Sequence, residues 1–245
     1  MSNELTLLTL TAASIGFLHT LLGPDHYLPF VFMAQAGRWS RAKTVAVTLA
    51  CGVGHVLSSV VLGVAGIALG LAVSNLEAIQ AVRGQVAGYV LIAFGLVYLV
   101  WGLRRAARQR PHSHFHRHAD GTVHVGLHVH QGDHLHVHTV EGESRAASVA
   151  RLSPWFLFTI FVFGPCESLI PLLMYPAARG SYWGVALVTI TFAAVTLATM
   201  LAAVLVCAAG VKRLPRHFAG LERYTHALAG GTLACCGAAI QFLGL

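Results

Sequence analysis

Charged side chains are scarce in this chain: Asp, Glu, Lys and Arg make up only 10% of its 245 residues. A soluble domain carries about 25% of them, so this chain has too little charge to keep its 56% of hydrophobic residues in water. Apolar runs of at least about 18 residues recur along it, and each is long enough to cross a bilayer as a helix. The scarcity of charge excludes a soluble enzyme and a disordered protein. It predicts an all-α polytopic membrane protein with the lipid bilayer as its partner.

Cysteine is also scarce, and the amino terminus lacks the features of a cleavable signal. The five cysteines lie inside apolar runs, which excludes the disulfide framework of a small secreted domain. Residues 1–4 contain no Lys or Arg, whereas a signal peptide opens with a basic segment. We therefore expect the apolar run at 5–22 to be the first membrane helix.

Six apolar runs are candidate membrane spans. They cover residues 5–22, 44–73, 86–103, 154–174, 182–211 and 227–245. Fourteen of the sixteen Lys and Arg residues fall in alternate connections, those after the first, third and fifth runs. By the positive-inside rule, both termini then lie outside and the long central connection lies in the cytoplasm. The net charge of +7 is chiefly this topology signal, and no aromatic-interleaved basic stretch indicates a nucleic-acid partner.

Two Gly-Pro motifs divide the chain into similar halves. The motifs are Gly23-Pro24-Asp25-His26 and Gly164-Pro165-Cys166-Glu167. Each ends the first span of its half and precedes a long second span. Three spans per half would make the copies inverted, as in transporters whose site lies near the midplane, although chance resemblance of the two motifs is the alternative. We expect three-helix membrane repeats at 1–103 and 153–245, each with a Gly-Pro break in its first helix, joined by a loop at 104–152.

Few ionisable residues are expected inside the membrane, and each is a candidate functional residue because charge is costly in hydrocarbon. They are His19, Asp25, His26, His55 and Glu167. In a regular helix His19 and His26 would stand about 10 Å apart along the axis. Pro24 removes one helical hydrogen bond, so a broken helix can fold Asp25 and His26 back toward His19. Two imidazoles and a carboxylate form a ligand set that suits Ni²⁺, Co²⁺, Zn²⁺ or Cu²⁺.

The remaining residues inside the membrane have two explanations each. His55 stands among small residues in the second span, where it either joins a metal path or makes an interhelical hydrogen bond. Glu167 is the second-half counterpart of the first motif, and with Asp25 it would neutralise one divalent cation. Cys166 beside it offers a soft ligand, or it is a small buried hydrophobe like the other cysteines.

Glu222 and His226 form a second possible chelate, near the cytoplasmic end of the last span. They stand four positions apart, so one face of a helix would carry both. A carboxylate at a helix amino terminus is also favourable without any metal. Both explanations stay open at this point.

Ten of the 15 histidines lie in the central loop, all at even-numbered positions. They are His112, His114, His116, His118, His124, His128, His130, His134, His136 and His138. In an extended chain these positions share one side, with Val and Leu on the other, and residues 131–133 would allow a hairpin turn. We expect a cytosolic metal-gathering surface, and a disordered low-complexity tract with ten imidazoles would bind transition metals too. Delivery, sensing and buffering of metal all stay open as its purpose.

The spacing of His19, Asp25 and His26 resembles the histidine–aspartate–histidine signature of the nickel/cobalt transporters, the NiCoT and NicO-type families. Six spans split by a His-rich cytoplasmic loop look like the nickel/cobalt efflux branch, whereas uptake members have one residue fewer between the first His and the Asp. The resemblance implies a transporter of the bacterial inner membrane, not an enzyme, in which His19, Asp25, His26 and His55 form the metal path. It implies Ni²⁺ or Co²⁺ as the transported substrate, with Zn²⁺ and Cu²⁺ left open.

We therefore expect a transporter that exports a divalent metal from the cytosol, with proton antiport as a candidate driving force because the ligands must lose protons to bind metal. One alternative is an uptake permease of the same family. Two alternatives come from other classes of protein, namely a metal sensor and a membrane thiol-redox conduit. An exporter of small anions would need a fixed positive charge near the midplane. The metal, the direction and the oligomeric state are left open by the sequence.

Overall fold

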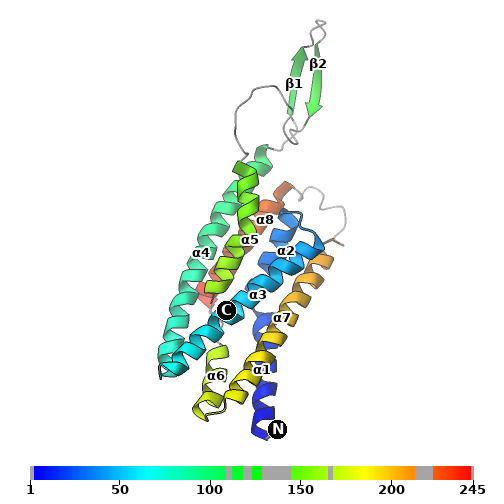
Figure 1. The fold of residues 1–245 in the computed structure, drawn as a ribbon. Helices are drawn as coiled ribbons and strands as arrows, with labels where there is room; N and C mark the ends of the chain where they lie inside the picture. Colours follow the sequence, from blue (N-terminus) through cyan, green and yellow to red (C-terminus); the bar gives the residue numbers. More distant parts are fainter. Residues whose placement is uncertain are drawn as a thin grey trace.

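The computed structural model describes residues 3–108, 112–117, 123–128, 145–164, 168–212 and 223–243 (Figure 1). Helices form the body of the molecule, and a two-stranded hairpin extends from one end. In chain order the elements are α1 (Asn3–Leu22), the 3-10 helix η1 (Pro24–His26), α2 (Leu28–Ala36), α3 (Arg41–Ala68), α4 (Val73–Arg108), β1 (His112–Arg117), β2 (Val123–His128), α5 (Arg145–Phe163), α6 (Leu169–Ala178), α7 (Tyr182–Lys212) and α8 (Thr225–Leu243).

Five of the described helices are long and apolar enough to cross a bilayer, namely α1, α3, α4, α7 and α8. Their outer faces carry large apolar side chains: Leu10, Val61, Val97 and Val206 are between 60% and 71% exposed. Apolar surface of this extent is unfavourable in water and suits contact with lipid. The chain is therefore an integral membrane protein.

The fourth expected span, 154–174, is not one helix. α5 ends at Phe163 and α6 begins at Leu169, while residues 165–167, which include Cys166 and Glu167, lie outside the described part of the chain. Pro165 has no amide hydrogen to donate to the carbonyl of Phe161, so a helix continued through it would lack this hydrogen bond. The apolar part of α5, Pro154–Phe163, and α6 are each too short to cross a bilayer alone.

Two other helices differ from the expectation. α4 begins at Val73 rather than at residue 86, because Gln80 and Arg83, which interrupt the apolar pattern, make hydrogen bonds to neighbouring helices. α2 follows the first Gly-Pro pair, where the sequence pattern indicates no helix of its own. Its Phe30, Val31 and Met33 are buried in the main core, so packing rather than length stabilises this nine-residue helix.

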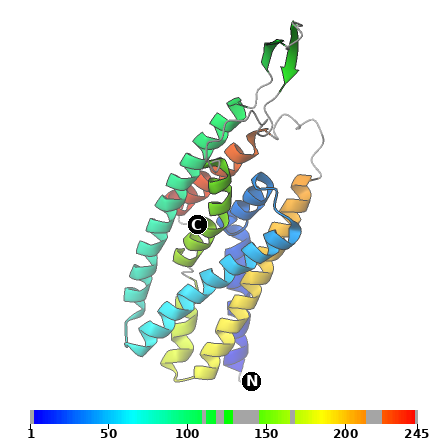
Figure 2. The ribbon, with the colours of Figure 1, turned by 45° about the horizontal axis from the view of Figure 1, so that its top comes forward.

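The two ends of the helix bundle differ in charge. Figures 1 and 2 show the α2–α3 junction, the end of α4, the start of α5, the end of α7 and the start of α8 at the end that carries the hairpin. The N-terminus and the α3–α4 and α6–α7 junctions lie at the opposite end. Arg38, Arg41 and Lys43 of the α2–α3 junction are thus at the hairpin end. The connections with most of the described basic residues gather at one end of the bundle.

The hairpin pairs β1 with β2 in antiparallel orientation, with His112 opposite His128 and His116 opposite His124. The connection between the two strands, residues 118–122, and the expected turn at 131–133 both lie outside the described residues. The even-numbered positions of the two strands face each other across the ladder, and positions directly opposite belong to the same face of a ribbon. The other five loop histidines lie outside the described residues: His118, His130, His134, His136 and His138.

α4 and α8 cross in close contact along glycines. A Cβ atom on Gly95 would collide with the backbone of Ala234, and one on Gly230 with the backbone of Leu99. Without side chains at these positions the two backbones touch, which is the packing that small residues permit between membrane helices. The same principle operates where Gly16 of α1 faces Thr196 of α7.

Candidate metal centre

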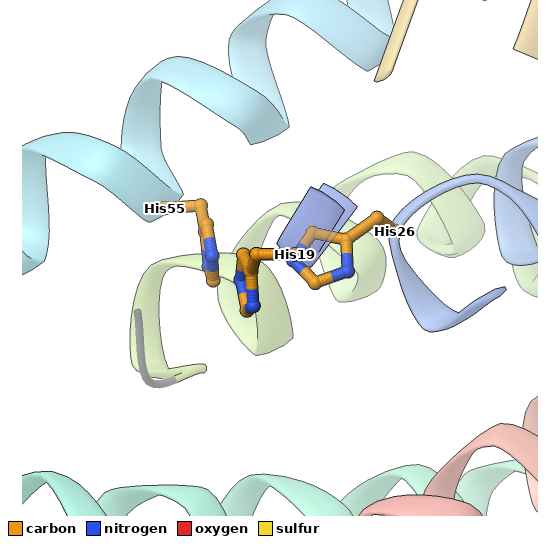
Figure 3. A group of neighbouring side chains, drawn as sticks. All are labelled: His19, His26 and His55. Carbon is orange, nitrogen blue, oxygen red and sulfur yellow. The ribbon is translucent and has the colours of Figure 1, made fainter. Parts of the chain in front are cut away.

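Three histidines from separate elements meet midway along the helices. His19 lies in the last turn of α1, His26 ends η1, and His55 lies in the middle of α3. The ring centroids of His19 and His26 are 4.6 Å apart, and those of His26 and His55 are 5.3 Å apart. Figure 3 shows the three rings gathered in one place. We call His19, His26 and His55 the three-histidine cluster.

The Gly23-Pro24 break brings His26 to His19. α1 ends at Leu22, where the Gly23 amide still donates to the His19 carbonyl at 3.0 Å, but Pro24 has no amide hydrogen with which to continue the helix. The chain then turns in η1, with the His26 amide donating to the Gly23 carbonyl at 3.1 Å. A Cβ on Gly23 would lie 2.6 Å from Nδ1 of His26. The turn therefore requires glycine at this position.

One nitrogen from each ring of the three-histidine cluster lies within 4.8 Å of the other two. Nickel and zinc bind imidazole nitrogen at about 2.1 Å, so two ligands of one ion are at most about 4.2 Å apart. The rings would close slightly around an ion. Exposure of His26 and His55 is only 3% and 5%, so any ion in this place would be largely removed from water.

The Nε2 atoms of all three rings are buried and have no hydrogen-bond partner among the described residues. A buried polar atom left unpaired costs about 1–3 kcal/mol, and natural proteins rarely leave such atoms together. Neutral imidazole is the commonest protein ligand of metal ions, and one ion can accept a lone pair from each of several such nitrogens. This group of unpaired nitrogens is the strongest evidence for a cation site.

The other ring nitrogens of two of these histidines are held by hydrogen bonds. Nδ1 of His26 lies 3.2 Å from Oδ1 of Asp25 and 3.2 Å from the carbonyl oxygen of Gly23. Nδ1 of His55 lies 3.2 Å from the carbonyl oxygen of Phe161. A histidine that binds metal usually donates its other N–H to a carboxylate or a carbonyl in this way, which orients the ring.

The cluster borders a small cavity of about 50 Å³. Its lining comprises His19, Asp25, His26, His55, Ala87, Leu91, Ile160, Phe161, Gly164 and Ile240. A cavity of this size has room for an ion and little else. Because the lining includes residues of α1, α3, α4, α5 and α8, both halves of the chain enclose it.

Asp25 lines the same cavity as the three rings, although its carboxylate is not among the ligand atoms that lie within 4.8 Å of one another. It pairs with Nδ1 of His26, the ring nitrogen other than the unpartnered Nε2. The side chain of Asp25 is 20% exposed, whereas that of His26 is 4% exposed. Asp25 therefore supports a ligand and supplies negative charge next to the cluster.

The second expected chelate is not formed by the described residues. His226 lies far along the chain at the start of α8, where its Nδ1 is 2.8 Å from the Tyr98 hydroxyl and its ring packs against Trp101. Glu222, like Cys166 and Glu167, lies outside the described residues. His226 thus has a structural partner in α4 and is separate from the three-histidine cluster.

The sequence pattern misses Arg83, which it assigns to a connection between spans. In the structure Arg83 lies inside α4 and donates to the carbonyl of Val162, adjacent to the Phe161 carbonyl that His55 binds. Gln80, one helical turn before it, accepts a hydrogen bond from Arg83 at 2.7 Å. A glutamine and an arginine three positions apart, flanking an apolar run, are the signal that marks this polar pair.

Replacing Asp25 by Asn is expected to weaken Ni²⁺ binding about 10–100-fold, because the charge behind the His26 ring is lost while its shape is kept. Equilibrium titration of the purified protein with Ni²⁺ measures the change. Glu77→Gln, at an exposed carboxylate of α4, is the matched control and should leave the affinity unchanged. Equal affinities for Asp25→Asn and the unmodified protein would show that the carboxylate does not assist a ligand.

Comparisons of the chain with protein-family models, with curated proteins and with solved structures match none of them. The function proposed below therefore rests on the geometry of the site and on the sequence.

Proposed function

We propose that this protein transports a divalent transition metal across the membrane and that the three-histidine cluster is its binding site in mid-passage. The observation that carries the proposal is the set of three buried Nε2 atoms without partners among the described residues. Imidazole nitrogens favour Ni²⁺, Co²⁺, Zn²⁺ and Cu²⁺ over hard cations. With the resemblance to nickel/cobalt transporters, Ni²⁺ and Co²⁺ are the preferred substrates.

A cation is favoured over an anion by the backbone around the cluster. α1 ends four residues before His26, and the last turn of α5 presents the Phe161 carbonyl to His55. Both broken helices therefore direct their carboxyl ends, which carry partial negative charge, to the cluster. Transporters with discontinuous helices use such ends to bind cations.

We further propose six spans arranged as two inverted repeats, with α5 and α6 together making the fourth crossing. The support is that the glycine contacts recur when the halves are exchanged. Gly95 contacts Ala234, and Gly237 contacts Ile92. Gly237 stands 142 positions after Gly95, and Ile92 stands 142 positions before Ala234, so each contact is the counterpart of the other. Such reciprocity is expected of two copies related by a two-fold axis.

The helix pairs α1–α7 and α3–α5, which enclose the cluster, show the same correspondence between the two halves. Gly16 of α1 faces Thr196 of α7, and Gly54 of α3 faces Phe158 of α5, with the same offset of 142 positions. The first half supplies all three histidines of the cluster. The offset of 142 pairs His19 with Phe161 and His55 with Leu197, while the Gly-Pro motifs, 141 positions apart, pair His26 with Glu167. The scaffold is thus pseudo-symmetric and the metal site is not.

The direction we propose is export from the cytosol of a bacterium, across its inner membrane. The basic connections at the hairpin end indicate that this end is cytoplasmic and that both termini lie outside. The His-rich loop would then collect metal on the side from which the ion leaves. Uptake by the same site, with the loop acting as a buffer, is the alternative within this class.

The decisive experiment is flux of Ni²⁺, Co²⁺, Zn²⁺ and Cu²⁺ into proteoliposomes that contain the purified protein, against protein-free vesicles. We expect saturable flux of at least one of these ions, Ni²⁺ or Co²⁺ first, and no flux of Mg²⁺ or of sulfite. Binding without flux would support a metal sensor instead, and sulfite flux without metal flux would support an anion exporter. Higher internal nickel in cells that express the protein would overturn the proposed direction.

A further inference from the structure

Arg83 joins three helices near the three-histidine cluster. From α4, its guanidinium donates to the Ser58 hydroxyl of α3 at 3.0 Å and to the Val162 carbonyl of α5 at 2.9 Å. Gln80 accepts from Arg83 at 2.7 Å and donates to the Ser59 hydroxyl at 3.1 Å. Gln80 is completely buried and Arg83 is partly buried, so this group is anchored in the interior of the bundle.

The group lies one turn beyond the cluster along α3. The Ser58 hydroxyl donates to the carbonyl of His55 at 2.9 Å while it accepts from Arg83. Val162 follows Phe161, the residue whose carbonyl is bound by the His55 ring. Arg83 therefore contacts the immediate neighbours of His55 on two helices.

The side of the cluster on which Arg83 lies is set by the direction of α3. This helix starts at the hairpin end of the bundle and ends at the opposite end, at its junction with α4. Ser58 follows His55 along the helix, so Arg83 is on the side away from the hairpin. On that side the cluster is followed by the positive charge of Arg83, which would repel a departing cation.

The hydrogen bonds of Arg83 also hold the broken end of α5. Carbonyls in the last turn of a helix lack partners within the helix, and the α-helical partner of the Val162 carbonyl would be residue 166, beyond the end of α5 at Phe163. Arg83 binds the Val162 carbonyl in place of such a partner. If α5 shifts relative to α3 and α4, this bond must break.

We propose that Arg83 is a positioning residue that closes the metal site on the side away from the hairpin, and that it releases Val162 and Ser58 when the ion departs. This inference rests on the proposed transport of metal. A closure residue controls the rate at which an ion leaves and enters, with little effect on equilibrium affinity. A residue that merely shapes the ligands would change the affinity instead.

The test compares two measurements on the purified protein in detergent: the equilibrium affinity for Ni²⁺ and the rate at which bound Ni²⁺ is released to excess EDTA. For Arg83→Gln we expect an affinity within threefold of the unmodified protein and a release at least tenfold faster. Arg83→Lys keeps the charge but not the paired hydrogen bonds, so its release should be intermediate. Arg179→Gln, at an exposed arginine of the α6–α7 junction, is the matched control and should match the unmodified protein in both.

Each result decides the inference. A release less than tenfold faster in Arg83→Gln, or an affinity changed more than threefold, would overturn it. If Arg83→Gln does not fold, Ser58→Ala removes one acceptor without changing the charge, and it must speed release at least threefold. Failure of the transport proposal is recognised separately, because the unmodified protein would then bind no Ni²⁺ or carry no flux, and the inference would fall with it.

Discussion

Replacing His26 by Ala is expected to abolish Ni²⁺ binding at the cluster and to lower Ni²⁺ flux in proteoliposomes by more than about 100-fold. His26 is the central ring of the three, with centroid distances of 4.6 Å to His19 and 5.3 Å to His55. Loss of a residue that only supports a ligand costs about 10–100-fold in affinity, and loss of the ligand itself should cost more. Its removal also leaves Asp25 without the ring with which it pairs.

His226→Ala is the control for this change. It also removes one imidazole from a membrane helix, but His226 bonds to Tyr98 and lies outside the cluster. We expect its flux to stay within about threefold of the unmodified protein, in keeping with the near-additivity of distant sites. If His26→Ala and His226→Ala reduce flux equally, the cluster is not the binding site.

Replacing Gly230 by Ala is expected to destabilise the protein by about 3 kcal/mol, at the upper end of the usual cost of overpacking. The new methyl group would collide with the backbone of Leu99, and a backbone cannot move aside as a flexible side chain can. α4 and α8 would have to separate along their whole contact. Thermal unfolding in detergent should show an apparent Tm lower by about 5–10 °C.

Gly231→Ala offers a matched control at the next position of the same helix. A Cβ atom there would meet nothing within 4 Å among the described residues. Since alanine favours a helix over glycine by about 1 kcal/mol, the Tm should be unchanged or higher. An equal loss of stability in both variants would contradict the close contact at Gly230.

The meeting of His19 with His26 could be predicted from the sequence, because its cause is local. Pro24 lacks the amide hydrogen that the helix needs, and Gly23 permits the close turn, so the chain must bend between the two histidines. The sequence also predicted a membrane protein, since scarce charge and long apolar runs exclude most other classes of protein. The resemblance to nickel/cobalt transporters adds an expectation about the ion, which flux measurements will test.

The rest of the site depends on which helices cross, and sequence periodicity carries no such information. His55 becomes the third member of the cluster only because α3 packs against α5, where the Phe161 carbonyl orients its ring. The sequence predicts that Arg83 belongs to the connection between the second and third spans. In the structure it lies inside α4, where Ser58 and Val162 accept hydrogen bonds from its guanidinium. The supporting place of Asp25 likewise follows from the turn of η1 rather than from its spacing.

The scarcity of charge, the breaks at Gly-Pro pairs and the concentration of histidine were determined by the sequence alone, since each depends on solvation or on the bonding of adjacent residues. The sequence also singled out His19, His26 and His55 among the 15 histidines, but only the tertiary structure decided that His55 converges with the other two. The reason is physical: a metal site requires lone pairs from distant segments to converge in a space without water. That convergence is a property of packed helices, and no single segment of the chain contains it.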